Sequence, residues 1–220
     1  YNANVVAVEL RPGQGSWAAE LNFEDPCGLC NLLRMNASEI TTASVENQLV
    51  TTPYGVRMIL ASNDTGDIDC ISNLEQYEAI IQQLSLLSPL SVLDIGTNFF
   101  PAIDVVIDKC DEIIVITEPQ PNAVKRTHTL IGELNNKGFG SAKVLTLVTL
   151  NHTRSDLTLS TSQIEEAINL PVALGIPPST EMAYQSAVRS IPICLVQPDS
   201  LVAQQFNNLA ELVSARSPKW

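Results

Sequence analysis

The segment "SVLDIGTNFF" (91–100) places an acid, Asp94, at the tip of an apolar run, with Gly96 two residues further on. Such a run, followed by an acid and a glycine, indicates a buried strand that ends in a turn before a helix. In many nucleotide-binding proteins an acid at this point holds the water shell of a magnesium ion. Elsewhere the same acid is a helix cap or a loop residue. The sequence leaves both roles open for Asp94.

The segment "CGLC" (27–30) is a second candidate for chemistry. A C-x-x-C pair serves as a redox dithiol or as half of a metal site. The other cysteines, Cys70, Cys110 and Cys194, are isolated, so no second pair completes a metal site. We favour the alternative, in which Cys27 and Cys30 are thiols at the start of a short helix. Five cysteines without framework spacing suit a reducing compartment, and we expect a cytoplasmic protein.

Composition bounds the possible partners. The 220 residues carry a formal net charge of -12, which argues against strong binding to nucleic acid or to anionic lipid. No apolar run approaches the roughly 20 residues of a membrane span. The two histidines, His128 and His152, are scattered and give neither a catalytic triad nor a metal spacing.

Short apolar, β-branched runs recur along the chain and alternate with helical patterns. We expect strands within residues 4–10, 55–61, 91–95, 112–117, 143–150 and 172–176. Their nearly continuous hydrophobicity is typical of parallel strands buried on both faces. The alternation predicts an α/β fold with a doubly wound, mainly parallel sheet and helices on both faces, in a single domain over residues 1–220.

Helix boundaries follow from capping signals. Ser72 with Glu75, and Ser162 with Glu165, have the spacing of capping boxes. Pro119 or Pro121 is expected to begin a helix that Gly138 ends, and a last helix is expected over residues 199–215.

Ligands of open α/β sheets bind outside the carboxyl ends of the strands, so these ends carry the functional signal. In chain order they read "VVAVELRPGQGSWAAEL", "SVLDIG", "DEIIVITEPQPNAVKRTHTLIGEL", "VLTLVTLNH" and "LPVALGIPPSTEMAYQSAVRSIPI". Their order and spacing resemble the MinD/ParA superfamily of deviant Walker-A ATPases, nearest the CpaE/TadZ branch that is associated with pilus assembly. The resemblance extends from about residue 4 to 213 and implies a P-loop NTPase-like fold of the SIMIBI type.

The resemblance also implies site residues and ligands. Asp94 would contact a water bound to Mg²⁺, Gly96 would let the backbone approach the phosphates, and Asn151 would face the adenine ring of ATP. Pro177 and Pro178 would lie near that ring. The implied partners are a second copy of the chain, in a homodimer, and proteins of a pilus, secretion or positioning system. Relatives also include proteins with a receiver-like domain, as in response regulators, and the sequence leaves that point open.

Two departures from the family pattern bear on catalysis. The P-loop motif G-x-x-x-x-G-K-[ST] does not occur in these 220 residues, so we expect the domain to be incomplete at its N-terminus. Where the family has Asp-x-Asp the chain reads Glu9-Leu10-Arg11, and where it has Gly-Asp the chain reads Gly15-Ser16. Glu9 remains a candidate nucleotide-site residue, but arginine reverses the charge and serine positions water poorly.

Three functions therefore remain open. The one we favour is a degenerate ATPase-like domain that dimerises and recruits partners without hydrolysis. The second is an active ATP-hydrolysing switch whose P-loop lies upstream of residue 1. The third is a thiol redox or metal protein that uses Cys27 and Cys30. Since the family's first strand is central, its absence would expose two strand edges, and we expect aggregation or repair through a dimer.

Overall fold

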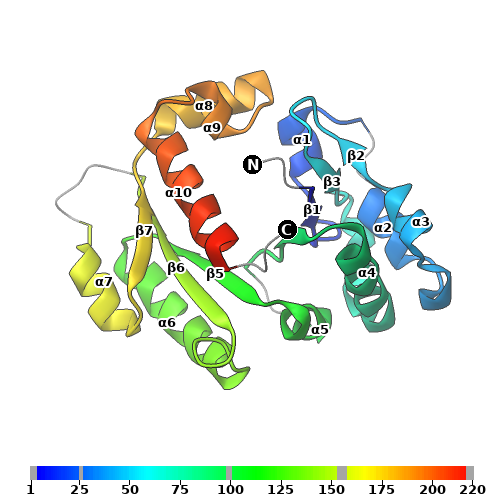
Figure 1. The fold of residues 1–220 in the computed structure, drawn as a ribbon, viewed down its shortest axis with the longest axis horizontal. Helices are drawn as coiled ribbons and strands as arrows, with labels where there is room; N and C mark the ends of the chain where they lie inside the picture. Colours follow the sequence, from blue (N-terminus) through cyan, green and yellow to red (C-terminus); the bar gives the residue numbers. More distant parts are fainter. Residues whose placement is uncertain (1–3, 25–26, 98–100, 153–157, 217–220) are drawn as a thin grey trace. The chain divides into compact units, whose positions relative to one another are not determined.

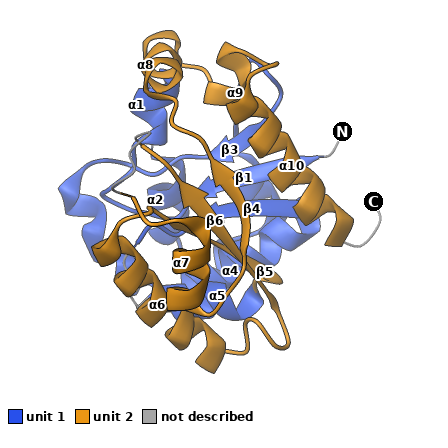
Figure 2. Cartoon of the chain, turned by 90° about the vertical axis from the view of Figure 1, so that its left-hand side faces the viewer, with its two compact units in different colours: residues 1–109, 220 blue, residues 110–219 orange. Residues whose placement is uncertain are grey.

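The computed structural model describes residues 4–24, 27–97, 101–152 and 158–216. Contacts divide the chain into two compact units, residues 1–109 with residue 220, and residues 110–219 (Figure 2). Each unit is a layered α/β body. The α/β class with mainly parallel strands and helices on both sides of the sheets is therefore confirmed, while the single domain stays a prediction.

Unit 1 contains a four-stranded sheet in the order β2-β3-β1-β4 (Figure 1). Strands β1 and β3, and β1 and β4, are parallel, and β2 is antiparallel to β3. In chain order the elements are β1 (Val5–Glu9), α1 (Trp17–Leu21), α2 (Gly28–Leu33), η1 (Ala37–Glu39), α3 (Thr42–Glu46), β2 (Val50–Thr51), β3 (Arg57–Ile59), η2 (Thr65–Ser72), α4 (Leu74–Leu87), β4 (Leu90–Asp94) and α5 (Pro101–Lys109).

Unit 2 contains a parallel three-stranded sheet in the order β5-β6-β7. Helices α6 and α7 lie on one face of this sheet and α10 on the other (Figure 1). The elements are β5 (Glu112–Thr117), α6 (Pro121–Asn136), β6 (Val144–Leu150), α7 (Thr161–Ile168), β7 (Val172–Ile176), α8 (Thr180–Arg189), α9 (Ile193–Val196) and α10 (Leu201–Arg216).

All six expected strands are present, but they are not equally buried. The middle strand β6 is buried along most of its length, as predicted. Strands β4 and β5 expose Val92, Ile114 and Ile116, by 51%, 38% and 59%. Within the described residues β4 pairs only with β1 and β5 only with β6. An edge strand lacks the neighbour whose side chains would cover it, so the expectation of burial on both faces was wrong for these two.

Two predicted capping boxes were wrong. Ser72 lies in the 3₁₀ helix η2, so α4 begins one residue later, after Asn73, whose amide donates to the Leu33 carbonyl instead. The box predicted at Ser162 is formed two residues earlier, by Ser160 and Gln163. Glu165 is used differently, because its Oε1 accepts the backbone N–H of Val172 at 2.9 Å and ties α7 to the start of β7.

The predicted ends of α6 are confirmed. Pro121 occupies its first turn, where the missing N–H costs nothing. Gly138 follows its last turn with φ of 91°, a backbone conformation that side chains disfavour.

Candidate functional site

The carboxyl ends of β1 and β4 lie side by side in unit 1. The register of the two parallel strands pairs Glu9 with Asp94, and the Leu10 N–H donates to the Asp94 carbonyl at 2.8 Å. The polar residues that follow β1 in sequence therefore meet the acid at the end of β4. The structure brings together Glu9 and Asp94, two of the candidate nucleotide-site residues.

Glu9 is completely buried, and backbone N–H groups hold its carboxylate. Its Oε1 accepts from the N–H of Ser16 at 2.7 Å and of Trp17 at 3.2 Å, at the start of α1. Its Oε2 accepts from the N–H of Ala61 at 3.1 Å, just after β3. Three donors compensate for much of the cost of burying a charge. Glu9 thus fixes α1 and the end of β3 to the end of β1.

Arg11 lies between the two acids. Its Nη2 is 2.8 Å from Glu9 Oε1 and 3.1 Å from Asp94 Oδ2, and it donates to Ser16 Oγ at 3.3 Å. The Glu9 side chain is fully buried, whereas about a quarter of Arg11 and a third of Asp94 are exposed (25% and 31%). Arg11 and Ser16 are therefore direct neighbours in the structure.

Asp94 is fully engaged by the protein. Its Oδ1 accepts the Gly96 N–H at 2.9 Å in a local turn, and its Oδ2 meets Arg11. Gly96 has φ of 66°, and a Cβ there would lie 2.9 Å from Arg11 Cδ. Both features favour glycine at position 96, and neither of them depends on a bound phosphate. In the structure Asp94 is the last residue of β4 and is paired with Arg11.

This arrangement does not fit a magnesium ion held between Glu9 and Asp94. Mg²⁺ takes oxygen ligands at about 2.0–2.1 Å and keeps several of its waters. The Arg11 guanidinium, a fixed positive charge, fills the space between these carboxylates. Ser16 supplies no carboxylate to position water, and its oxygen accepts from Arg11. Arg11 therefore offsets one of the two negative charges at these strand ends and occupies oxygens of both carboxylates.

The other predicted nucleotide-site residues lie in unit 2. Asn151 follows β6, and both its backbone N–H and its side-chain amide donate to the Ile176 carbonyl at 3.0 Å, at the end of β7. Pro177 and Pro178 come directly after that carbonyl. The three residues are thus neighbours at the carboxyl edge of the β5-β6-β7 sheet. They do not share unit 1 with Glu9, Asp94 and Gly96.

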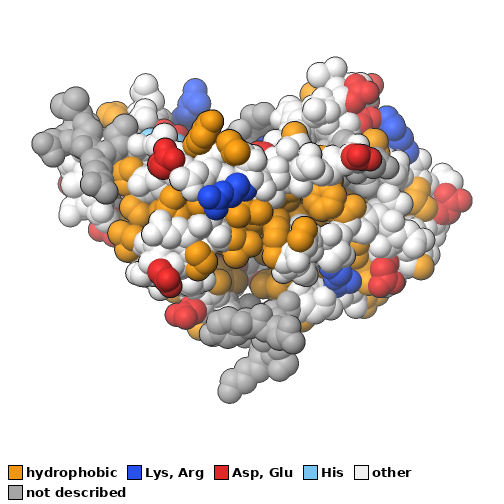
Figure 3. Space-filling model, turned by 90° about the horizontal axis from the view of Figure 1, so that it is seen from above, with side chains coloured by type: hydrophobic (Ala, Val, Ile, Leu, Met, Phe, Trp, Pro, Cys, Tyr) orange, Lys and Arg blue, Asp and Glu red, His pale blue; other side chains and the backbone are white. Residues whose placement is uncertain are grey.

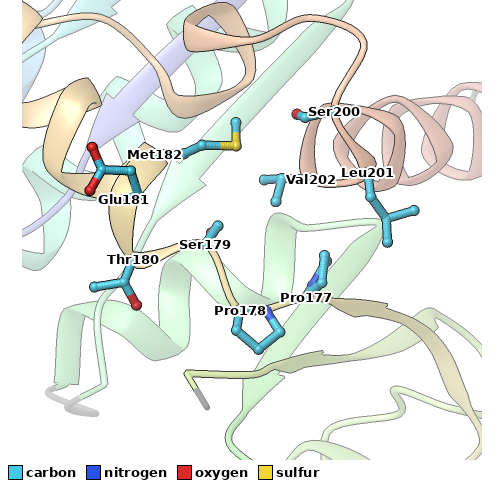
Figure 4. A pocket seen from close by; sticks show the side chains of 9 residues that line it. All are labelled: Pro177, Pro178, Ser179, Thr180, Glu181, Met182, Ser200, Leu201 and Val202. Carbon is cyan, nitrogen blue, oxygen red and sulfur yellow. The ribbon is translucent and has the colours of Figure 1, made fainter. Parts of the chain in front are cut away.

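A pocket of about 330 Å³ opens beside the two prolines. Figure 4 shows that its walls come from the loop before α8, from the first turn of α8 and from the start of α10. The lining residues are mostly apolar with a few hydroxyls and one acid: Pro177, Pro178, Ser179, Thr180, Glu181, Met182, Ser200, Leu201 and Val202. An apolar pocket of this kind suits a flat, neutral ring better than a group of phosphates.

Apolar side chains are also exposed on the helices around this pocket. The large ones in α8, α9 and α10 are Tyr184, Val188, Leu195 and Leu201, exposed by 43% to 68%. Figure 3 shows that apolar side chains are exposed on the face seen from above, with charged side chains among and around them. An apolar patch on a surface is typical of a place where another molecule binds.

One side-chain hydrogen bond at the strand ends of unit 2 was not predicted. His152 Nε2 lies 3.0 Å from Glu118 Oε1, and Gln120 donates to Glu118 Oε2 at 3.0 Å. The two partners are 34 positions apart in sequence. The available signal was that Glu118 is the first residue after β5 and His152 the second after β6, and that β5 and β6 are neighbouring parallel strands.

The C-x-x-C segment forms a helix start, as favoured. Cys27 precedes α2 and Cys30 lies inside it, with no exposed surface. Burial and the neighbouring Asp67 carboxylate raise the pKa of Cys30 to about 12. A thiol that stays protonated at neutral pH is a poor nucleophile and a poor metal ligand. No group of three or more His, Cys, Asp or Glu side chains with metal-binding geometry occurs in the described part of the chain.

Comparison with solved structures identifies the class of fold. No protein-family profile matches the sequence, and no curated protein matches it. Solved structures do match over nearly the whole chain. The cell-division ATPase MinD of Pyrococcus furiosus has a TM-score of 0.76 at 17% identity, covering 97% of this chain and 86% of MinD. A ParA-family ATPase of Chlorobium tepidum has a TM-score of 0.76 at 16% identity, covering 96% and 86%.

A third match is the septum site-determining protein MinD of Pyrococcus horikoshii, solved with Mg-ADP. Its TM-score is 0.75 at 16% identity, and the alignment covers 99% of this chain and 87% of that MinD. These similarities define the class of fold, the P-loop NTPase-like fold of MinD and ParA ATPases. Among the described residues, no helix has the length and apolar composition needed to cross a bilayer.

Proposed function

We propose that the chain is a degenerate ATPase-like domain of the MinD/ParA superfamily that acts by binding and not by hydrolysis. It forms a dimer and recruits or localises partner proteins in the cytoplasm. The single observation that carries the proposal is the contact of Arg11 Nη2 with both Glu9 and Asp94. A cation between these carboxylates leaves them unable to organise a metal ion and an attacking water.

In this proposal unit 2 retains a ligand-binding role. Asn151, Pro177 and Pro178 form the edge at which the adenine ring of ATP would bind, and the apolar pocket beside the prolines supports that assignment. Glu181 at the pocket wall would repel phosphates, so the base and not the phosphate chain would supply the contacts there.

The partner class comes from the resemblance to the CpaE/TadZ branch, and we propose proteins of a pilus or secretion assembly. The exposed apolar side chains of α8, α9 and α10 support a protein-binding role of unit 2. A recruitment module needs such a surface, whereas an enzyme that acts on a small molecule does not.

The test combines ATP turnover with oligomeric state. We expect the protein to release no phosphate above the background of a heat-unfolded sample, and to form dimers in sedimentation velocity runs. The Asp94→Ala variant should leave any nucleotide affinity unchanged, because Asp94 already contacts Arg11. Steady ATP turnover that Asp94→Ala abolishes would refute the proposal and favour the active switch.

A further inference from the structure

Helix α8 of unit 2 carries an exposed strip of apolar side chains. None of its ten residues is buried. Tyr184 and Val188 are 68% and 66% exposed, and Ala183 and Ala187 beside them are exposed as well. Residues four positions apart lie on the same side of a helix, so these four side chains form one charge-free strip. An amphipathic helix with such a strip is suited to packing against another helix.

A row of polar residues runs along the strip, on the side opposite to the alanines. Glu181, Gln185 and Arg189 follow one another at intervals of four residues, with the acid in the first turn and the base in the last. Gln185 Nε2 donates to Glu181 Oε1 at 3.0 Å, so the amide and the acid lie side by side. Among the described residues, no base pairs with Glu181 and no acid pairs with Arg189. The row therefore carries a negative, a neutral and a positive group in that order.

This row is complementary to itself when its direction is reversed. A second copy of α8 in antiparallel orientation, related by a two-fold axis at Gln185, places Glu181 opposite the partner's Arg189. Eight residues rise about 12 Å along a helix, so two such ion pairs form together, one on each side of the axis. The same axis places Ala183 opposite the partner's Ala187, and these small side chains let the two helices approach closely.

We propose that α8 is a homodimerisation surface, which packs antiparallel on α8 of a second copy without requiring nucleotide. This dimer deepens the proposed function and rests on it for its biological meaning. It leaves Leu195 in α9 and Leu201 in α10 exposed for other proteins. Two ten-residue helices are about 15 Å long and bury less than the roughly 800 Å² per partner of a standard interface. We therefore expect a weak dimer that dissociates on dilution.

The experiment measures the dimer dissociation constant by sedimentation equilibrium in nucleotide-free buffer. Glu181→Arg and Arg189→Glu each bring like charges together at both contacts of the dimer, and each should weaken it about tenfold or more. A 1:1 mixture of these two variants restores opposite charges at both contacts, so the mixed dimer should be as tight as that of the wild type.

Glu166→Arg, at an exposed position of α7, is the matched control for a change of charge. By itself it should leave the dissociation constant of the dimer unchanged. Mixed with Arg189→Glu, it should not restore dimerisation, because opposite net changes of charge are present but the α8 contacts remain repulsive.

A wild-type protein that stays monomeric at all concentrations without nucleotide would overturn the proposal. A mixture of the two α8 variants that associates no more tightly than either alone would overturn it too. If a charge variant does not fold, Tyr184→Ser replaces it, and unchanged dimerisation of that variant refutes the surface. Because the assay contains no nucleotide, the two proposals fail separately. ATP turnover by the wild type refutes the proposed function, whereas a dimer that forms only with ATP refutes the α8 surface.

Discussion

The two units bury different kinds of polar group. Among the described residues, the buried polar side chains of unit 1 include the carboxylates of Glu9 and Asp67, whereas those of unit 2 are all threonines: Thr117, Thr127, Thr146 and Thr149. Each of these two buried carboxylates has an arginine partner, Arg11 for Glu9 and Arg34 for Asp67. Unit 1 thus buries carboxylates of two charge pairs completely or nearly so, whereas unit 2 buries hydroxyls and leaves its Arg216–Glu112 pair partly exposed, by 37% and 14%.

The strand ends show the same contrast. In unit 1 the acids at the ends of β1 and β4 are bound by the protein's own cation and backbone. In unit 2 the side chains of Glu118 and His152 are about half exposed, 40% and 56%, and a pocket opens at residues 177–182 and 200–202. Unit 2 therefore offers exposed side chains to a ligand at its strand ends. In unit 1 the acids at the strand ends already contact Arg11 and backbone N–H groups.

The largest expected effect is on stability, at Glu9. Glu9→Gln replaces a buried carboxylate oxygen by an amide group that faces backbone N–H donors, and it removes the closer of the two carboxylates that pair with Arg11. We expect a loss of about 3 kcal/mol in the free energy of unfolding. The matched change in unit 2 is Thr117→Val, which removes the 2.8 Å bond from Thr127 Oγ1 and should cost about 1 kcal/mol.

Urea denaturation of both variants measures this difference. Glu46→Gln, at an exposed position of α3, controls for the loss of one negative charge. If Glu9→Gln and Thr117→Val lower the free energy of unfolding by the same amount, buried charge does not distinguish the stability of the two units.

A second difference should appear at alkaline pH. The pKa of Cys30 is raised from 9.0 to about 12, so the folded state keeps a proton that the unfolded chain has lost. The stability contributed by the neutral thiol is complete below pH 9 and is lost as the pH rises toward 12, by up to about 1.4 kcal/mol per pH unit.

The free energy of unfolding, measured from pH 8 to 11, should fall less steeply in Cys30→Ala than in the wild type. Burial also raises the pKa of Cys110 in unit 2, so Cys110→Ala is measured beside it. An identical slope in Cys30→Ala and the wild type would show that this thiol does not control the alkaline behaviour.

A third prediction concerns the edges of both sheets. Val92→Lys in β4 and Ile116→Lys in β5 replace exposed apolar side chains on strands that have one described neighbour. A lysine on an edge strand opposes pairing with another chain. Static light scattering at increasing concentration should show less aggregation in both variants.

Leu86→Lys is the control for edge specificity, because Leu86 is 70% exposed but lies on helix α4. An equal gain in solubility from Leu86→Lys would mean that general surface polarity, and not the strand edge, limits solubility.

The smallest expected effect on stability is at the exposed apolar surface of unit 2. Tyr184→Ser and Val188→Ser change side chains that are 68% and 66% exposed, and the free energy of unfolding should change by less than about 0.5 kcal/mol. The same variants should weaken the capture of partner proteins if this surface recruits them. A loss of stability above about 1 kcal/mol would show instead that the two side chains belong to the core.

Much of the fold was predictable because it is encoded locally. The apolar runs at residues 112–117 and 172–176 are strands with the predicted bounds, since β-branched side chains favour the strand wherever they are buried. Helix ends were less predictable. Ser162 and Glu165 have the spacing of a capping box, but Ser160 and Gln163 have it too, and packing of α7 against β7 decided between them.

The sequence by itself determined the α/β class and the carboxyl strand ends at which polar residues gather. Only the tertiary structure decided that Arg11 contacts both Glu9 and Asp94. Glu9 and Asp94 are 85 positions apart and meet because β1 pairs with β4. Spacing along a chain fixes which residues end a strand, whereas the order of strands in a sheet fixes which of those ends are neighbours.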